Sequence, residues 1–210
     1  MTAAQLNSHA YAEQFVPEGE ALEAARHTGS SLGAPPIGTG GGAALRLLAA
    51  AVGAHHVVEV GEGAGVSGLW LLDGMPEDGV LTTIELEPEH ALRAKRSFSA
   101  AGIAAQRTRV ITGRALDVLP RMNDSSYDLV HIDAGHLHAP AIVPLALERL
   151  EPGGVLVLDQ ALLGGAVADP TVRTPRVRAL RQLLQDLARR TDLTRLLLPI
   201  DDGMLVLRRL

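Results

Sequence analysis

Cysteine is absent from the 210 residues, and aromatic residues make up only 2% of them. The first absence excludes disulfides, thiolate metal sites and cysteine nucleophiles. The second means that Leu, Val, Ile and Ala must fill most of the core. The chain also lacks an apolar run long enough to span a bilayer, and its first 25 residues lack the basic start and apolar core of a signal peptide. We therefore expect a soluble cytoplasmic protein with no membrane partner.

Positive charge is also scarce. Lys95 is the only lysine, and 19 basic residues face 24 acidic ones, which gives a net charge of −5. This balance offers no electrostatic reason to expect duplex nucleic acid or an anionic membrane as a partner. With 47% hydrophobic residues, the composition is that of a globular protein, and the length suits a single domain over residues 1–210.

Apolar, β-branched runs alternate with helical patterns through most of the chain. The expected strands are 57–60, 80–84, 109–111, 127–132 and 154–158. The expected helices between them are 66–74, 88–101, 114–121 and 139–150. Such alternation is typical of a parallel sheet covered by helices on both faces. A helix over 176–190 and a hairpin of 194–200 with 204–209 complete a doubly wound, mostly parallel seven-stranded α/β sheet that ends in an antiparallel strand.

The residues before the first strand predict helical additions to this sheet. Two short amphipathic helices are expected over 3–14 and 18–27, and an Ala/Leu-rich helix over 43–53. Between them, the segment "HTGSSLGAPPIGTGGG" (27–42) has the composition of a flexible loop. Residues 1–42 thus form N-terminal helices and a loop that can cover a site on the sheet.

The segment "VVEVGEGAGVSG" (57–68) runs from the first strand into a glycine-rich turn. In doubly wound sheets ligands bind at the carboxyl ends of the strands. Part of the segment matches G-x-G-x-x-G, and Glu85 follows at the distance of a residue that binds a ribose diol. However, the dinucleotide pattern should begin at Gly61, directly after the strand, and a pyrophosphate would be repelled by Glu62.

A ligand that carries an ammonium and a sulfonium would instead be attracted by Glu59 and Glu62. Such a ligand is S-adenosylmethionine, and E-x-G-x-G-x-G is typical of methyltransferases. The alternatives are a nicotinamide dinucleotide and a tight turn that binds nothing.

Two further acids, Asp133 and Asp159, are predicted to lie at the ends of the fourth and fifth strands. If these strands are neighbours, about 4.8 Å apart, the carboxylates could share a hard cation. The alternative is that both acids only cap strand ends. His136 and His138 follow on the same loop as Asp133, and these three side chains are also the ingredients of an Fe²⁺ or Zn²⁺ facial triad.

These motifs together resemble the cation-dependent O-methyltransferases related to catechol and caffeoyl-CoA O-methyltransferases, in particular the small bacterial members. The similarity runs from "YAEQFVPEGEALEAAR" to "DDGMLVLRR". Its motifs are "VVEVGEGAGVSGLWL", "GVLTTIELEPEHALRAK", "YDLVHIDAGH" and "LEPGGVLVLDQALLGG". The resemblance implies a Rossmann-like class I methyltransferase that moves the methyl group of S-adenosylmethionine to a hydroxyl of a small molecule, and that forms a homodimer.

The resemblance also implies roles for individual residues. Ser67 would hold the cofactor carboxylate at a helix start, where free N–H groups favour an anion. Glu85 would accept hydrogen bonds from both ribose hydroxyls. Ile37 and Gly38 would close over the adenine, although Ile37 is equally an ordinary core residue. The other positions assigned to the cofactor are Glu59, Gly61, Glu62, Gly63, Gly65, Leu86, Gly113, Arg114, Ala115 and Asp133.

In the resembling family, Asp133, Asp159 and a following Asn ligate Mg²⁺, which holds and acidifies the acceptor hydroxyl. This chain has Gln160 instead of the Asn, and Mg²⁺ demands near-ideal octahedral geometry. It also has His136 where the family has a Lys. His136 would act with Asp133 as a catalytic residue, as a general base, or would face solvent.

Three other functions remain open at this stage. Some bacterial relatives methylate a modified tRNA base, and an Arg-rich helix within 173–190 could support an RNA acceptor or could be a solvated face. Gln160 and the missing Lys leave room for a cofactor-binding protein without catalysis. The least favoured alternative is a nicotinamide-dependent oxidoreductase. The acceptor site is expected between the loops 135–140 and 160–175 and the turn 201–203.

Overall fold

The predicted seven-stranded sheet is present in the computed structural model, which describes residues 2–133 and 138–210. The strands lie in the order β3-β2-β1-β4-β5-β7-β6. The first five pair in parallel, while β7 is antiparallel to β5 and to β6. The bounds are β1 His56–Val60, β2 Val80–Glu85, β3 Thr108–Thr112, β4 Tyr127–Ile132, β5 Leu150–Leu158, β6 Leu193–Leu198 and β7 Met204–Arg209.

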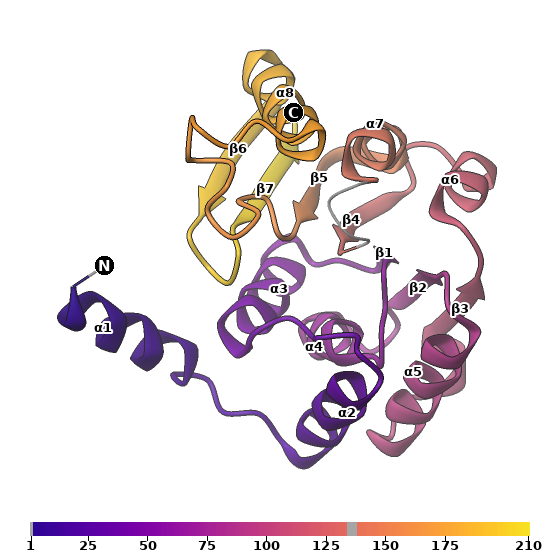
Figure 1. The fold of residues 1–210 in the computed structure, drawn as a ribbon. Helices are drawn as coiled ribbons and strands as arrows, with labels where there is room; N and C mark the ends of the chain where they lie inside the picture. Colours follow the sequence, from indigo (N-terminus) through magenta and orange to yellow (C-terminus); the bar gives the residue numbers. More distant parts are fainter. Residues whose placement is uncertain (1, 134–137) are drawn as a thin grey trace.

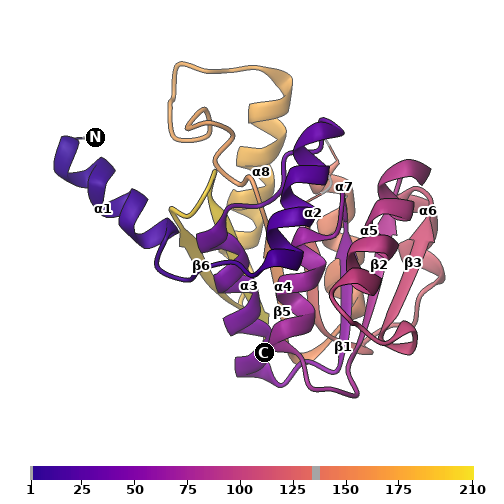
Figure 2. The same cartoon turned by 90° about the horizontal axis from the view of Figure 1, so that it is seen from below.

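Helices cover both faces of the sheet (Figures 1 and 2). One face packs against α3 Thr39–Val52, α4 Val66–Gly74 and α5 Pro88–Ala100, with α2 Glu20–Ser31 outside them. The other face packs against α6 Ala115–Val118, α7 Ala139–Arg149 and α8 Pro175–Arg189. Short 3₁₀ turns, η1 Ala105–Arg107 and η2 Leu119–Arg121, join elements on the sheet's rim. Leu, Val, Ile and Ala make up most of both core clusters, as the composition predicts.

The order of the strands places the candidate site. The chain moves outward from β1 to β3 and then returns to β4 on the other side of β1. The reversal therefore lies between β1 and β4, and ligands of doubly wound sheets bind beside such a switch point. No helix among the described residues is long and apolar enough to cross a membrane.

The predicted loop over residues 27–42 is shorter than expected. α2 continues to Ser31, and α3 begins at Thr39 rather than at residue 43. Glycines extend α3 because its first turn receives partners from elsewhere: the Gly40 N–H donates to Glu13 at the end of α1 Ala3–Glu13 (2.9 Å). A carboxylate at a helix start satisfies one of the free N–H groups there. Residues 32–38 remain as the connecting loop.

Candidate functional site

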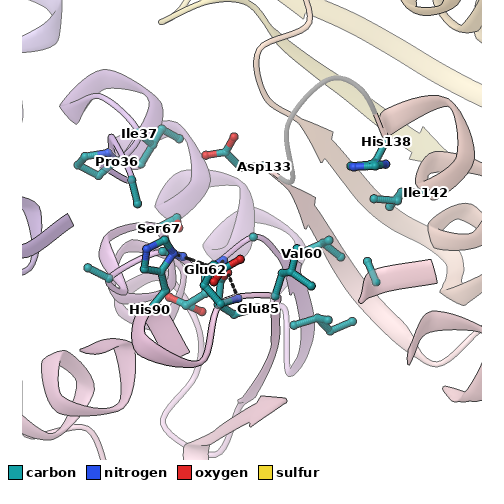
Figure 3. A pocket seen from close by; sticks show the side chains of 18 of the residues that line it. Pro36, Ile37, Val60, Glu62, Ser67, Glu85, His90, Asp133, His138 and Ile142 are labelled. Atoms are coloured by element: carbon teal, nitrogen blue, oxygen red, sulfur yellow. Dashed lines mark hydrogen bonds and ion pairs between the residues drawn. The ribbon is translucent and has the colours of Figure 1, made fainter. Parts of the chain in front are cut away.

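A cavity of about 590 Å³ opens at the carboxyl ends of β1, β2 and β4. The glycine-rich turn after β1 and the end of β2 form one wall (Figure 3). Residues 113–116 after β3 line the cavity as well. Residues 34–37 of the N-terminal loop lie across it, and Asp133 and Gln160 stand at the side nearest to β5. The cavity is therefore built from segments far apart in the sequence.

The turn after β1 needs its glycines. Gly61, Gly63 and Gly65 have φ values of 89°, 58° and 99°, in the left-handed region that side chains disfavour. A Cβ on Gly65 would also lie only 3.2 Å from the Cα of Ala94 in α5. The alternating glycines of the sequence thus let the chain turn tightly from β1 into α4 and bring its backbone to the cavity wall.

Glu85 fastens this turn from the end of β2. Its Oε2 accepts hydrogen bonds from the N–H groups of Glu62 (3.0 Å) and Gly63 (2.8 Å). Its Oε1 accepts one from the N–H of Glu87 (2.9 Å), and Nδ1 of His90 lies 3.7 Å from the same oxygen. A carboxylate offers about four lone-pair sites, so Glu85 can hold the turn and still accept from a ligand in the cavity.

A buried chain of polar side chains lies on the α4 side of the sheet. His131 of β4 is fully buried between Glu59 of β1 and Asp159, which follows β5. Its Nδ1 lies 3.0 Å from Glu59 Oε1, and its Nε2 lies 2.8 Å from Asp159 Oδ2. Burial alone would lower the pKa of His131, but the two carboxylates outweigh it and raise the pKa to about 10. The hydrogen bond from His131 in turn keeps the pKa of Glu59 low despite its burial.

Glu62 is a buried acid in the turn after β1. Its side chain is 3% exposed and lies against Gly68 and Phe98, and its carboxyl oxygens have no hydrogen-bond partner among the described residues. Burial, and then the negative charge of Glu59, raises its pKa well above the ordinary value. Burial and the neighbouring charge thus favour the neutral form of Glu62, which weakens the repulsion of a pyrophosphate that the sequence suggested at this residue. The other carboxyl side chains on the cavity wall are Glu85, Glu87 and Asp133.

Asp133 and Gln160 face each other where β4 and β5 end. Gln160 Nε2 donates to Asp133 Oδ1 (2.7 Å). The backbone of Gln160 has a φ of 56°, which is uncommon for a residue other than glycine. Burial, and then the charge of Asp159, raises the pKa of Asp133 to about 7. Asp159 itself does not line the cavity.

No cluster of three or more His, Asp or Glu side chains in the described part of the chain could hold a metal ion. The alternative facial triad cannot be followed further, since His136 lies outside the described residues. His138, at the start of α7, lines the cavity.

Most residues that the sequence assigned to a cofactor line this one cavity. Gly38, Glu59 and Gly65 do not: Gly38 lies under the carboxylate of Asp201, Glu59 is bonded to His131, and Gly65 packs on α5. The sequence missed His131, although a histidine inside the apolar run "YDLVHID" is the signal that could have revealed it. The predicted residues that line the cavity are Ile37, Gly61, Glu62, Gly63, Ser67, Glu85, Leu86, Gly113, Arg114, Ala115, Asp133 and Gln160.

Two of the segments expected to enclose the acceptor are fastened to each other. The N–H groups of Ala161 and Leu162 donate to the carbonyls of Gly203 (2.9 Å) and Asp202 (2.8 Å). The N–H of Gly164 donates to Asp202 Oδ1 (2.6 Å). The loop after β5 and the turn between β6 and β7 therefore form one wall beside Gln160.

The N-terminal loop is held over the cavity by an internal ion pair. Arg26 of α2 binds Glu18 with its Nε (2.7 Å) and donates from Nη1 to the Ile37 carbonyl (2.7 Å). Glu18 also accepts from the indole N–H of Trp70 in α4 (3.2 Å). The loop is thus joined both to α2 and to the helix that follows the glycine turn.

Solved structures that superpose on this chain include O-methyltransferases. A protein from Corynebacterium glutamicum superposes with a TM-score of 0.92 at 31% identity, over 98% of this chain and 97% of its own. The O-methyltransferase TomG of Streptomyces achromogenes, which is involved in tomaymycin synthesis and was crystallised with S-adenosylmethionine, has a TM-score of 0.88 at 31% identity and covers 100% and 99% of the two chains.

Sequence comparison gives the family. The O-methyltransferase family profile matches residues 12–210. A relative from Mycolicibacterium vanbaalenii, provisionally named an O-methyltransferase, is 47% identical over 95% of this chain and 88% of its own. One from Mycobacteroides abscessus with the same provisional name is 46% identical over 95% and 93%. The chain belongs to the O-methyltransferase family.

Proposed function

We propose that this O-methyltransferase binds S-adenosylmethionine in the cavity at the ends of β1, β2 and β4 and methylates a hydroxyl of a small molecule. The observation that supports this most is the position of Glu85, which holds the glycine turn and faces the same cavity as Asp133. A carboxylate in the position of Glu85 can accept hydrogen bonds from both hydroxyls of a ribose diol.

The residues present fit this cofactor. Ser67 and the N–H groups at the start of α4 lie at the cavity wall, where they can bind a carboxylate. Residues 113–116 offer backbone and aliphatic surface along the adenine, and Ile37 lines the same cavity. When bound, S-adenosylmethionine supplies a methyl group on a positively charged sulfur. The residues of the chain have to orient the acceptor oxygen towards that methyl group and exclude water.

Asp133 is the described residue best placed to receive the acceptor proton. It lines the cavity, is close to the wall formed by residues 160–164 and 201–203, and has a pKa of about 7. A general base with a pKa near the working pH is effective because it is both ionised and basic enough to take a proton. His136 stays a prediction, since it lies outside the described residues.

Calorimetry with S-adenosylhomocysteine tests the cofactor assignment. We expect the wild-type chain to bind this ligand and to bind NAD far more weakly. Glu85→Ala should weaken S-adenosylhomocysteine binding by about 10- to 100-fold, because charge-assisted hydrogen bonds contribute about 1.5–3 kcal/mol. Glu89→Ala, which removes an exposed carboxylate from the neighbouring helix, should leave the affinity unchanged. Equal affinity in both variants would contradict the assignment.

The acceptor is tested by methyl transfer from labelled cofactor to catechols, caffeoyl thioesters and tRNA. We expect transfer to a small-molecule hydroxyl. Transfer to tRNA alone would favour the RNA alternative. Arg181 of α8 offers little to an RNA partner, because its guanidinium group donates to four backbone carbonyls, those of Ala166, Val167, Val172 and Asp169. Cofactor binding without transfer to any acceptor would favour a non-catalytic binding protein.

We further propose that the chain forms a homodimer through its N-terminal segment. Tyr11 and Phe15 are both 71% exposed, their rings are 6.4 Å apart, and they lie at the end of α1, which projects from the sheet (Figure 1). The sequence has only one Trp, two Tyr and two Phe, so two neighbouring exposed rings are a large part of its aromatic content. Aromatic side chains are enriched in protein interfaces.

A further inference from the structure

The carboxylate that follows β5 is already bonded inside the protein. Asp159 Oδ2 is 2.8 Å from His131 Nε2, and His131 Nδ1 is 3.0 Å from Glu59 Oε1. His131 pairs in register with Glu59 of β1 and with Val157 of β5, and its side chain is fully buried. A ring held at both nitrogens in the middle of a sheet cannot turn away to release Asp159.

Asp133 is engaged as well. Its Oδ1 accepts the amide N–H of Gln160 at 2.7 Å, so the amide presents a donor to the carboxylate. The backbone of Gln160 is held at a positive φ of 56°, a conformation that costs free energy and persists only where the surrounding structure enforces it. The N–H group of Ala161, next along the chain, is bonded to the Gly203 carbonyl, which helps to keep this conformation.

The three positions that the resemblance assigns to Mg²⁺ therefore do not fit the ion. Mg²⁺ needs oxygen ligands in a nearly regular octahedron. Here one oxygen of each carboxylate is already an acceptor, and Gln160 directs an N–H group towards Asp133. An imidazole ring that is hydrogen-bonded to two carboxylates donates one N–H group to each of them. These N–H groups take the place of a metal ion as partners of the carboxylate oxygens. The hydrogen bonds of His131 and Gln160 satisfy these oxygens of the two acids without a metal ion.

We propose, on the basis of the methyltransferase function proposed above, that this chain transfers the methyl group without a divalent cation and that His131 is a positioning residue that holds Asp159 in the place of one. The acceptor oxygen bonds to the methyl carbon, and the carbon–sulfur bond breaks with its electron pair staying on sulfur. The hydroxyl proton passes to the carboxylate of Asp133. No metal-bound oxygen takes part in this step.

Nuclear magnetic resonance of the full chain, labelled with ¹⁵N-histidine and saturated with S-adenosylhomocysteine, tests both halves of the proposal. We expect two slowly exchanging ring N–H signals from His131, identified by their loss in His131→Gln, and no change in them when MgCl₂ is added. A saturable shift at stoichiometric Mg²⁺ would overturn the metal-free step. The absence of the two N–H signals would overturn the positioning role.

Variants that release Asp159 give a second, independent test by electron paramagnetic resonance with MnCl₂. The triple variant combines Glu59→Gln, His131→Leu and Gln160→Asn. It frees Asp159 from its histidine partner and removes the buried carboxylate that His131 neutralises. It also replaces Gln160 with the shorter amide of the resembling family. We expect this triple variant to bind Mn²⁺ saturably, while the wild type and Gln160→Asn alone do not. Equal Mn²⁺ affinity of Gln160→Asn and the triple variant would overturn the role of His131. If the triple variant does not fold, the ring N–H signals of His131 in the wild type decide whether the proposal holds.

These tests are separate from those of the proposed function. Calorimetry with S-adenosylhomocysteine is done without Mg²⁺. If the ligand does not bind, the proposed methyltransferase site is contradicted. If it binds, the two resonance experiments decide whether a metal ion takes part. Once an acceptor is known, EDTA should leave kcat/KM within about twofold of its starting value, and a larger loss that Mg²⁺ restores would contradict the proposal.

Discussion

Glu62 shows how burial decides the behaviour of a single side chain. It follows Gly61 in the turn that approaches the cavity, yet its carboxyl group folds back beside Glu59, where it is 3% exposed. Two carboxylates so close in a buried site cannot both be ionised at little cost. The hydrogen bond with His131 lowers the pKa of Glu59 despite its burial, whereas burial and the charge of Glu59 raise the pKa of Glu62.

Replacing Glu62 with glutamine should make the protein more stable at neutral pH than the wild type. The folded-state pKa of Glu62 is raised above its ordinary value of 4.5 by burial and by the charge of Glu59, with a smaller contribution from Glu85. The part of the free energy of unfolding that depends on the proton bound to Glu62 is fully present below pH 4.5. It is lost as the pH rises from 4.5 towards the folded-state pKa. Glu62→Gln keeps a neutral group at every pH and avoids this loss.

Urea unfolding of both proteins between pH 4 and pH 8 measures the effect. The free energy of unfolding of Glu62→Gln relative to the wild type should rise with pH above 4.5, by at most about 1.4 kcal/mol per pH unit. Glu89→Gln, an exposed carboxylate on α5, should show a flat difference. A flat difference for Glu62→Gln as well would mean that Glu62 is ionised in the folded protein.

Single residues also mark where sequence reasoning stops. Glu85, Asp133 and the glycines of the turn were predictable, because their spacing from the strand ends places them at one edge of the sheet. The raised pKa of Glu62 was not predictable, since a pKa depends on neighbours in space. The bond of His131 to Asp159 was also hidden, because it joins residues 28 positions apart whose pairing follows from the strand register.

At the scale of elements, α3 and α4 pack closely because glycines stand where they cross. A Cβ on Gly74 of α4 would lie 2.2 Å from the Arg46 carbonyl of α3, and a Cβ on Gly42 of α3 would lie 2.2 Å from Trp70 Nε1 of α4. Both contacts are far shorter than non-bonded atoms allow. The α3–α4 pair in turn supports the glycine turn and the loop above the cavity.

Gly74→Ala should therefore destabilise the protein by about 2 kcal/mol or more, the usual cost of overpacking. Gly42→Ala should cost less, because the Trp70 ring can shift more easily than a helix backbone and because alanine is worth up to about 1 kcal/mol over glycine inside a helix. Urea unfolding at neutral pH compares them with Gly19→Ala, whose Cβ would meet nothing within 4 Å. Equal stability of Gly74→Ala and Gly19→Ala would contradict the close contact.

The elements themselves were mostly readable from the sequence, because strands and helices of a doubly wound sheet carry strong apolar periodicity. The exception is the segment 27–42, where composition predicts a loop and the structure has the end of α2 and the first turn of α3. Glycines 40–42 are poor helix formers by propensity. They are helical here because Glu13 binds the helix start and Trp70 fills the space beside Gly42, and local composition contains neither contact.

At the scale of the whole molecule, several large apolar side chains are exposed on the described surface of the chain. Tyr11 and Phe15 lie together at the end of α1, and Leu196 and Leu197, which are 52% and 43% exposed, lie on opposite faces of β6. β6 is one of the two edge strands of the sheet, and an edge strand offers unpaired backbone groups to another chain. A second copy of the chain could cover both the aromatic pair at the end of α1 and the edge of the sheet at β6.

We expect the full chain to elute as a dimer in size-exclusion chromatography with light scattering. The double variant Tyr11→Ser/Phe15→Ser should dissociate at concentrations at least about 10-fold higher than the wild type, because losing two buried aromatic side chains costs more than 1.4 kcal/mol of association free energy. Leu92→Ser provides the matched control, since Leu92 is an apolar residue 48% exposed on α5, away from α1 and β6. A monomeric wild type, or equal dissociation of both variants, would show that the aromatic pair at the end of α1 does not hold two copies together.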